Sequence, residues 1–254
     1  MKARFYITGL FLSLFSVFHL SAQEVGLTGD ERGFILKNEL TFHITAHSEG
    51  LGLGGRWGAQ NTVYSQRFID FDMLGMKHPK EIKMGNVYMF DDARKFVYGK
   101  QNSVFISRLG LGSVTTLNEK PYWGGIDVRR FYSFGLSVAM AKPVYLYILK
   151  QTTSSYYYDL VLERYNPALH DLSNIYGRGP FLEGLGESRF YPGLYFKGGV
   201  SFEYGHEKST ARYLEVGVAA DAYLSKIPMM AYDKNRNYFI TFYISGNFGR
   251  RYNP

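Results

Sequence analysis

Long segments of the chain alternate between apolar and polar side chains, the pattern of a β-strand with one apolar face. In the first segment, Phe34 to Ala46, large apolar residues occupy one parity and polar residues such as Glu39 and His43 occupy the other. Seven more such segments follow, at about 51–61, 67–73, 103–112, 126–140, 194–204, 213–224 and 238–248. The sequence therefore predicts an all-β fold with eight strands.

These predicted strands, roughly 10 to 15 residues each, are longer than the usual five or six and match a strand tilted across a bilayer, about 9–11. One face carries large aromatic residues, and the other carries Gly, Ala, Ser, Thr and opposed charges. Large apolar groups suit lipid and small or charged groups suit a narrow interior. We predict an eight-stranded antiparallel transmembrane β-barrel with long extracellular loops. The alternative is a secreted lipocalin-like barrel or sandwich, which turns its apolar face inward.

The connections between these strands fit that barrel. If the N-terminus is periplasmic, every second connection faces outward. Pro143, just past the fifth strand, predicts an edge or a bend above the bilayer. The first outward loop, 48–50, is short, and the long extracellular loops are expected at about 74–102, 149–192 and 225–237.

The first residues form a short basic start, Met1 to Arg4, then an apolar stretch from Phe5 to Leu20, then small residues. This order is that of a secretory signal peptide, 1–22, cut after Ala22. The alternative is a membrane anchor, but an apolar run of about 15 residues is short of the roughly 20 that a spanning helix needs. Residues 23–254 are then the outer-membrane barrel domain.

Composition narrows the alternatives. The 254 residues include 22 Tyr, 20 Phe and 28 Gly, which favours strands and tight turns over a coiled coil or a disordered chain. The absence of Cys excludes disulfides and zinc–thiolate sites. The net charge of +7 comes from scattered Lys and Arg, so we expect outer-membrane lipid and lipopolysaccharide as partners, and no nucleic acid. Arg250 and Arg251 are expected to anchor the periplasmic interface.

The polar parity predicts a set of charges inside the barrel. An eight-stranded barrel is just wide enough for side chains to fill, and unpaired buried charges are costly. We therefore expect a salt-bridged lumen rather than a proton or ion pathway. Besides His43, the expected lumen ion network contains Lys37, Glu39, Asp70, Asp72, Arg108, Asp127, Arg129, Lys197, Glu203, Glu215 and Asp221.

The sequence gives only weak evidence for catalytic or cofactor sites. The segment 50–55 fits a G-x-G-x-x-G dinucleotide pattern, but no helix follows it, so its glycines more simply relieve crowding in the barrel. His43 and His47 lie about 13 Å apart on one strand, too far to share a metal. We expect no metal, no cofactor and no enzyme activity. The enzymatic alternative is lipid A modification by His43 or His47 with a nearby Ser and acid, without support from a nucleophile elbow.

The outer loops carry the residues expected to bind partners. In the loop 149–192, Tyr176, Arg178 and Phe181 follow turn formers, and Tyr and Arg are favoured interface anchors. Loops on a rigid scaffold commonly carry function. The alternative is that these loops fold over the barrel mouth as a cap.

Several short motifs resemble those of small, largely uncharacterised outer-membrane barrels of Bacteroidota-type bacteria. They are His78-Pro79-Lys80-Glu81, Tyr98-Gly99-Lys100 with Asn102-Ser103, Gly124-Gly125-Ile126-Asp127-Val128-Arg129, Lys142-Pro143-Val144-Tyr145 and Asn174-Ile175-Tyr176-Gly177-Arg178. The resemblance covers nearly the whole mature chain. It implies an outer-membrane location, and for some members a role as accessory subunits of barrel-assembly or secretion complexes. It supplies no catalytic residues.

We therefore predict a structural or accessory subunit of an envelope protein complex that binds partners through its extracellular loops. The alternatives are a lipid A-modifying outer-membrane enzyme and a narrow conduit or adhesin.

Overall fold

A computed structural model describes residues 37–86, 93–119, 125–151, 158–204 and 209–253. The predicted signal peptide and the start of the first predicted strand, 34–36, lie outside the described residues. Residues from Leu36 to Pro254 form one compact unit.

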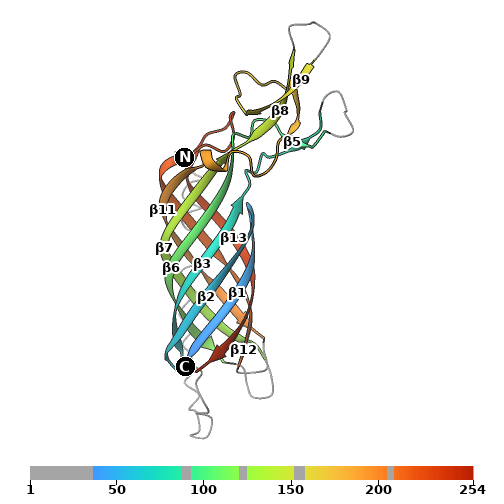
Figure 1. The fold of residues 1–254 in the computed structure, drawn as a ribbon. Helices are drawn as coiled ribbons and strands as arrows, with labels where there is room; N and C mark the ends of the chain where they lie inside the picture. Colours follow the sequence, from blue (N-terminus) through green and yellow to red (C-terminus); the bar gives the residue numbers. More distant parts are fainter. Residues whose placement is uncertain (1–36, 87–92, 120–124, 152–157, 205–208, 254) are drawn as a thin grey trace, which may run out of the picture. The chain divides into compact units, whose positions relative to one another are not determined.

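Eight antiparallel strands close into a barrel (Figure 1). Around the barrel the order is β1, β13, β12, β11, β7, β6, β3, β2, so each strand pairs with a neighbour in sequence and β1 closes on β13. The prediction of an eight-stranded antiparallel barrel is confirmed. The strands are β1 (Asn38–His47), β2 (Gly50–Thr62), β3 (Ser65–Met76), β6 (Asn102–Asn118), β7 (Asp127–Pro143), β11 (Arg189–Glu203), β12 (Thr210–Ile227) and β13 (Arg236–Tyr252).

The strands are longer than the alternation predicts. β7 extends to Pro143 and β11 begins at Arg189, because the two continue to pair, Ala141 opposite Arg189, past the regular pattern. The long connections are therefore 77–101, 144–188 and 228–235, and they leave the same end of the barrel, which we call the loop end. The opposite end holds Asn38 paired with Tyr252, and we call it the termini end.

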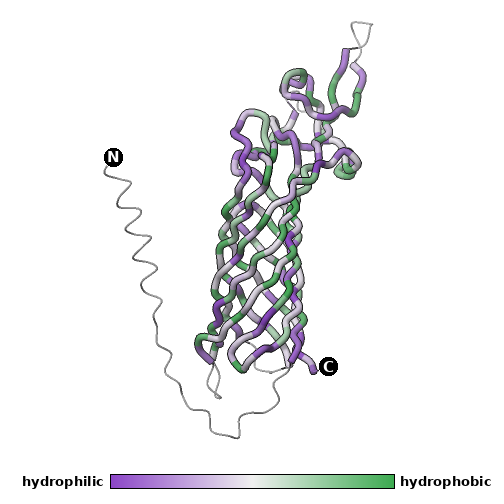
Figure 2. Tube along the Cα trace, turned by 90° about the vertical axis from the view of Figure 1, so that its left-hand side faces the viewer, coloured by the Kyte–Doolittle hydropathy of each residue, from purple (hydrophilic) through white to green (hydrophobic). Residues whose placement is uncertain are grey.

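Hydrophilic and hydrophobic residues follow one another repeatedly along the barrel strands (Figure 2). In β12 every second residue from Ala211 to Tyr223 is inward and largely buried, and the residues between them are exposed. The outward face is apolar around the whole barrel. It includes Leu40, Phe42, Ile44, Leu51, Leu53, Ile69, Phe71, Leu109, Leu111, Phe134, Leu136, Leu194, Phe196, Val216, Val218, Ile240, Phe242 and Ile244, all exposed.

Two small sheets, which the alternation did not predict, are built from the loops. β8 (Tyr145–Gln151), β9 (Tyr158–Arg164) and β10 (Ile175–Arg178) form a sheet in the order β10, β8, β9. β4 (Lys83–Met84) pairs with β5 (Phe96–Val97). Pro143 ends β7, and β8 starts two residues later, which agrees with the predicted bend.

The loop sheets share an apolar core of their own. Phe96, Leu146, Ile148, Tyr165 and Ile175 are buried against one another. They come from β5, β8, β10 and the segment after β9, so the described parts of the loops 77–101 and 144–188 share one core. We call these described parts, residues 77–86, 93–101, 144–151 and 158–188, the loop module.

Candidate functional site

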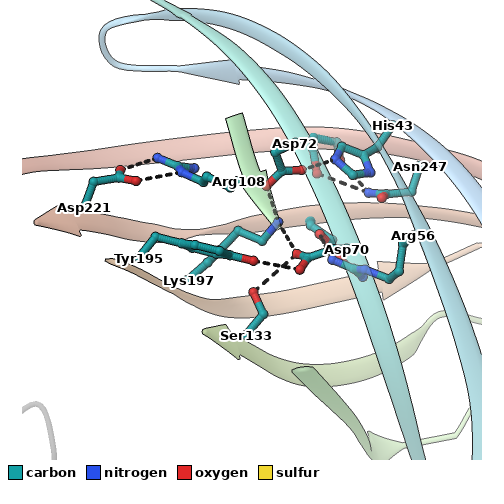
Figure 3. A network of polar contacts seen from close by, with 12 residues as sticks. His43, Arg56, Asp70, Asp72, Arg108, Ser133, Tyr195, Lys197, Asp221 and Asn247 are labelled. Carbon is teal, nitrogen blue, oxygen red and sulfur yellow. Dashed lines mark hydrogen bonds and ion pairs between the residues drawn. The ribbon is translucent and has the colours of Figure 1, made fainter. Parts of the chain in front are cut away.

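The middle of the lumen is organised around Lys197 (Figure 3). Its ammonium lies 2.8 Å from a carboxylate oxygen of Asp70 and 2.8 Å from one of Asp72. Tyr195 donates a hydrogen bond of 2.7 Å to Asp70, and Ser133 donates one of 3.3 Å. All of these side chains are buried. The two carboxylates thus have one cation and two hydroxyl donors as partners. Buried charges need such partners, because an unpaired charge away from water is costly.

His43 joins this layer through Asp72. Its Nε2 lies 2.6 Å from Asp72 Oδ1, and both side chains are buried. Gly54 stands opposite His43 on β2, and a methyl group there would lie 2.4 Å from the His43 ring and 2.7 Å from Asp72. This glycine therefore makes room for the pair, a use of the segment 50–55 that has nothing to do with nucleotides.

Two further ion pairs flank the Lys197 layer. Arg108 donates two hydrogen bonds to Asp221, and Ser137 donates a third of 2.9 Å to the same carboxylate. Arg56 donates to both oxygens of Glu215, at 2.5 and 3.2 Å. The Arg56 guanidinium also lies 4.1 Å from the centre of the Phe68 ring. Paired, fork-like contacts of this kind hold both partners in one orientation.

The termini end of the lumen is closed by a ladder of alternating charges. Arg251 contacts Glu39 at 2.7 Å and both oxygens of Glu203 at 2.7 and 2.8 Å. Arg129 pairs with the same Glu203 and lies 3.6 Å from Asp127. The side chains of Arg129 and Arg251 are only slightly exposed, so this ladder is the polar mouth of the barrel.

Ten of the eleven residues predicted for the lumen network are thus inside the barrel, and each is in an ion pair. Lys37 is a correction. It precedes β1, its side chain is exposed, and its backbone N–H bonds Asn253. Its position in the alternation predicted an inward side chain, but the first barrel strand begins only at the next residue, Asn38.

The alternation overlooked two of the lumen cations. Arg56 sits in the Gly-rich strand β2, where alternation is weak, but it shares the parity of Gly54 and lies opposite Asp70 on β3. Arg251 is a second correction: it turns inward to Glu39 and Glu203 instead of anchoring the interface. Asn247, Gly249 and Arg251 have the same parity on β13, which could have revealed it.

Apolar side chains fill the loop end of the lumen. Leu74, Met76, Val104, Ile106, Ile227, Met229 and Phe239 form one buried cluster with Tyr223. Below it lies a cavity of about 10 Å³ among Asp72, Arg108 and Lys197, at the limit of what one water occupies. The polar interior thus ends at an apolar plug.

Loop contacts fix the loop module to its surroundings. The Asn86 amide donates hydrogen bonds of 2.6 and 3.2 Å to the carbonyls of Ile175 and Tyr176. The N–H of Ala231, from the loop 228–235, donates to Gly99 at 2.7 Å. Asp233 in the same loop contacts Lys80 at 2.9 Å and His78 at 3.4 Å. The three long loops therefore hold one another.

The three residues predicted to bind partners all belong to the loop module. Tyr176 and Arg178 are on β10 and line an open hollow of about 220 Å³ with Arg94, Tyr147, Gly177 and Pro180. Phe181, 50% exposed, stacks edge-on against Phe105 and has the Lys142 ammonium 5.2 Å from its ring centre. Phe181 thus packs against Phe105 of the barrel wall and does not line the hollow, but its ring centre lies 5.8 Å from the Arg178 guanidinium.

The histidines of the enzymatic alternative face the lumen. His43 is buried there in contact with Asp72, and His47 is on the same strand and parity. Neither ring is on the apolar outer face. Among the described residues, no group of three or more His, Cys, Asp or Glu is placed to hold a metal ion, and no helix is long and apolar enough to cross a membrane.

Sequence comparisons give no relatives. No protein-family model matches the chain, and no curated protein is similar in sequence. Among solved structures, the chain is similar to Ail, the attachment invasion locus protein of Yersinia pestis, with 10% identity, a TM-score of 0.40, and 85% of this chain and 99% of that chain covered.

Two other solved barrels are similar at the same level. For Neisserial surface protein A the identity is 9% and the TM-score 0.40, with 85% and 96% of the two chains covered. For the N-terminal β-barrel domain of Pseudomonas aeruginosa OprF the values are 9%, 0.34, 84% and 98%. Similarity at this level concerns the barrel architecture alone and assigns neither a family nor a function. The Bacteroidota-type grouping stays a prediction.

Proposed function

We propose that this chain is an outer-membrane β-barrel with a sealed, salt-bridged lumen that presents the loop module at the cell surface. The observation that carries the proposal is the outer face, which is apolar on all eight strands, around an interior that holds the charges. A water-soluble barrel is arranged the other way round. Lipid is the solvent that makes such an outer face favourable.

The location follows from the same argument. Residues 1–22 are a signal peptide in this proposal, and export would bring the chain to the outer membrane. Outer-membrane barrels have short periplasmic turns and longer extracellular loops. The loop end is therefore extracellular, and the charge ladder of Glu39, Arg129, Glu203 and Arg251 faces the periplasm.

We propose that the chain acts as an accessory subunit of an envelope complex, with the loop module as its binding surface. A filled lumen suits a rigid anchor better than a conduit. The loop module has its own apolar core and presents Tyr176, Arg178 and Phe181, of residue types that dominate protein interfaces. A lipid-modifying enzyme would need a reactive group reachable from lipid, whereas His43 is enclosed by the barrel wall.

A mild-detergent pull-down of the tagged protein from its own membranes, with mass spectrometry and lipid analysis, tests this role. We expect stoichiometric envelope proteins with the unchanged chain and their loss from the triple variant Tyr176→Ala, Arg178→Ala, Phe181→Ala. The matched control is Tyr158→Ala, Leu160→Ala, Arg164→Ala, which removes exposed side chains of the same kinds from β9.

The possible outcomes of these experiments distinguish the subunit role from its alternatives. Loss of partners from the first triple variant but not from the control supports the subunit role. A barrel that purifies with lipid alone contradicts it and favours an adhesin that acts without envelope partners. An altered lipid A mass in a deletion strain that the unchanged chain restores, and that His43→Ala or His47→Ala fails to restore, would instead support the enzymatic alternative.

A further inference from the structure

The hollow on the loop module is built from two strands and a crossing segment. β8 supplies Tyr147, and β10 supplies Tyr176, Gly177 and Arg178, with Pro180 just beyond. Arg94 comes from the segment that leads into β5. Two tyrosines and two arginines are thus among the residues that line a volume of about 220 Å³ at the loop end, outside the barrel.

Backbone contacts set the spacing of the two arginines. The Arg178 N–H donates a hydrogen bond of 3.1 Å to the Arg94 carbonyl. A methyl group on Gly177 would lie 2.9 Å from that carbonyl oxygen and 3.1 Å from the Arg94 nitrogen. Only glycine lets the two segments approach this closely. The fold therefore holds the backbones of Arg94 and Arg178 side by side.

The described residues supply no carboxylate partner to this pair of arginines. Both side chains are exposed, and within the described ranges neither lies within 4.0 Å of a carboxylate oxygen. Arg178 also lies 5.8 Å from the Phe181 ring centre, and Lys142 lies 5.2 Å from the same ring, so a third cation is close. The lumen arginines, by contrast, are all matched with acids. Like charges held together repel, and an anion placed between them relieves that repulsion.

We propose that this hollow binds an anionic sugar, a saccharide unit that carries a sulfate, phosphate or carboxylate group. Two guanidinium groups match such an anion with paired hydrogen bonds. Tyr147 and Tyr176 offer flat amphipathic rings with a polar end, suited to the face and hydroxyls of a sugar. The volume is below the roughly 300–1,000 Å³ of pockets for drug-sized ligands, so it suits one ring with its charged substituent.

The structure favours a sugar over an acidic peptide. A peptide commonly binds by adding a strand to a free sheet edge. At this hollow the edge of β10 is already engaged, since Arg178 bonds the backbone of Arg94 and Asn86 bonds the carbonyls of Ile175 and Tyr176. What remains accessible is side-chain chemistry, cationic and aromatic.

The anionic sugar has two available sources, the lipopolysaccharide of the same leaflet and a soluble acidic polysaccharide. Isothermal titration calorimetry with the purified full chain in detergent compares three probes: a sulfated disaccharide, its unsulfated counterpart, and lipopolysaccharide from the native membrane. The variants are Arg94→Ala and Arg178→Ala. The control is Arg164→Ala, an exposed arginine on β9 of the same sheet that does not line the hollow.

We expect the sulfated disaccharide to bind at least about tenfold more tightly than the unsulfated one, with weaker binding at higher salt. Each variant should lose about tenfold in affinity, the loss typical of one charge-assisted pair, and Arg164→Ala should stay within about twofold. Lipopolysaccharide binding with the same dependence on Arg94 and Arg178 supports the site and identifies the membrane as the source.

Other results overturn the inference: equal binding of the unsulfated sugar, equal loss with Arg164→Ala, or no binding of either charged probe. So does binding of an aspartate-rich peptide when neither charged sugar binds. Because the titration contains no partner protein, its failure is separate from failure of the proposed subunit role.

Discussion

At the residue scale, the ion pairs in the middle of the lumen join strands that are not adjacent in the barrel. Arg108 on β6 is satisfied by Asp221 on β12, and the side chains of both are almost fully buried. Breaking a buried pair by removing one charge is far more costly than replacing both partners with apolar groups, because the first change leaves an uncompensated ion.

We predict that Asp221→Asn destabilises the barrel by about 3–5 kcal/mol, because Arg108 is left buried without its counterion. Urea titration of the protein refolded into lipid vesicles measures the change. The folded fraction is read on gels, where a folded barrel that has not been boiled migrates differently from the unfolded chain. The double variant Arg108→Met, Asp221→Leu should recover most of the loss. Equal destabilisation by the single and double variants would contradict the ion-pair argument.

Asp233 gives a residue-scale prediction outside the membrane. Hydrogen bonds from the Lys80 ammonium and from the Lys234 N–H lower the pKa of its carboxyl below the ordinary value. Because the folded pKa is depressed, this contact contributes above the ordinary pKa and is lost as the pH falls through the folded pKa. His78, 3.4 Å from the same carboxylate, also acts to lower the pKa of Asp233.

The loop contact at Asp233 can be followed by spin labels, since the chain has no native cysteine. With labels at Ile82→Cys and Lys234→Cys, both exposed positions, we expect a narrow distance distribution at neutral pH that broadens only in strong acid. Asp233→Asn should broaden it at neutral pH as well. A distribution that stays narrow in that variant would show that other contacts hold the loops together.

At the scale of elements, one face of each barrel strand is exposed and the other faces the lumen. The free-energy cost of a charge on the exposed face depends on its position along the strand. Leu136 lies near the middle of β7, 63% exposed, with exposed Leu109 and Leu194 opposite it on the neighbouring strands. Leu117, 46% exposed, is the last residue but one of β6 at the termini end. If lipid surrounds the wall, a charge at these two positions has different costs.

We predict that Leu136→Arg costs about 2–4 kcal/mol in vesicles and Leu117→Arg about 0–1 kcal/mol, because only the first places a cation at the bilayer midplane. The unfolding free energies of the two variants in the same lipid measure this difference. A small, equal cost at both positions would mean that water, not lipid, covers the outer face.

At the scale of the whole molecule, the barrel and the loop module have separate cores. The barrel closes through pairing of β1 with β13, which uses no residue of the loop module. β7 and β11 pair directly, Ala141 opposite Arg189, so a short hairpin can join them.

We predict that replacement of residues 143–187 by Asn-Gly, a favoured two-residue hairpin turn, leaves a folded barrel that keeps its heat-dependent shift on gels. The same protein should lose its partners in the pull-down. A shortened chain that fails to fold would show that the loop module contributes to barrel stability.

The filled lumen also bears on transport. Ion pairs occupy its middle, the charge ladder its termini end and the apolar cluster its loop end. We therefore expect no stepwise conductance in planar bilayers. Reproducible steps would reveal a path through the barrel and favour the conduit alternative.

The sequence by itself determined the barrel. Period-two alternation follows directly from strand geometry, so it could be read without knowing any contact, and it predicted all eight strands and most inward residues. The alternation gave wrong or no predictions where the period weakens or stops. Arg56 lies among glycines, and Lys37 lies just before β1 begins. The strands of the loop sheets are too short to show a pattern.

Only the tertiary structure decided which charges meet and what the loops build. Asp70 is on β3 and Lys197 on β11, strands that are not adjacent, so their contact depends on the curvature that closes the ring. Arg94 and Arg178, far apart in sequence, become neighbours through one backbone hydrogen bond beside a glycine. Alternation is local and survives in the sequence, whereas these contacts arise from chain closure and loop packing, which no local pattern records.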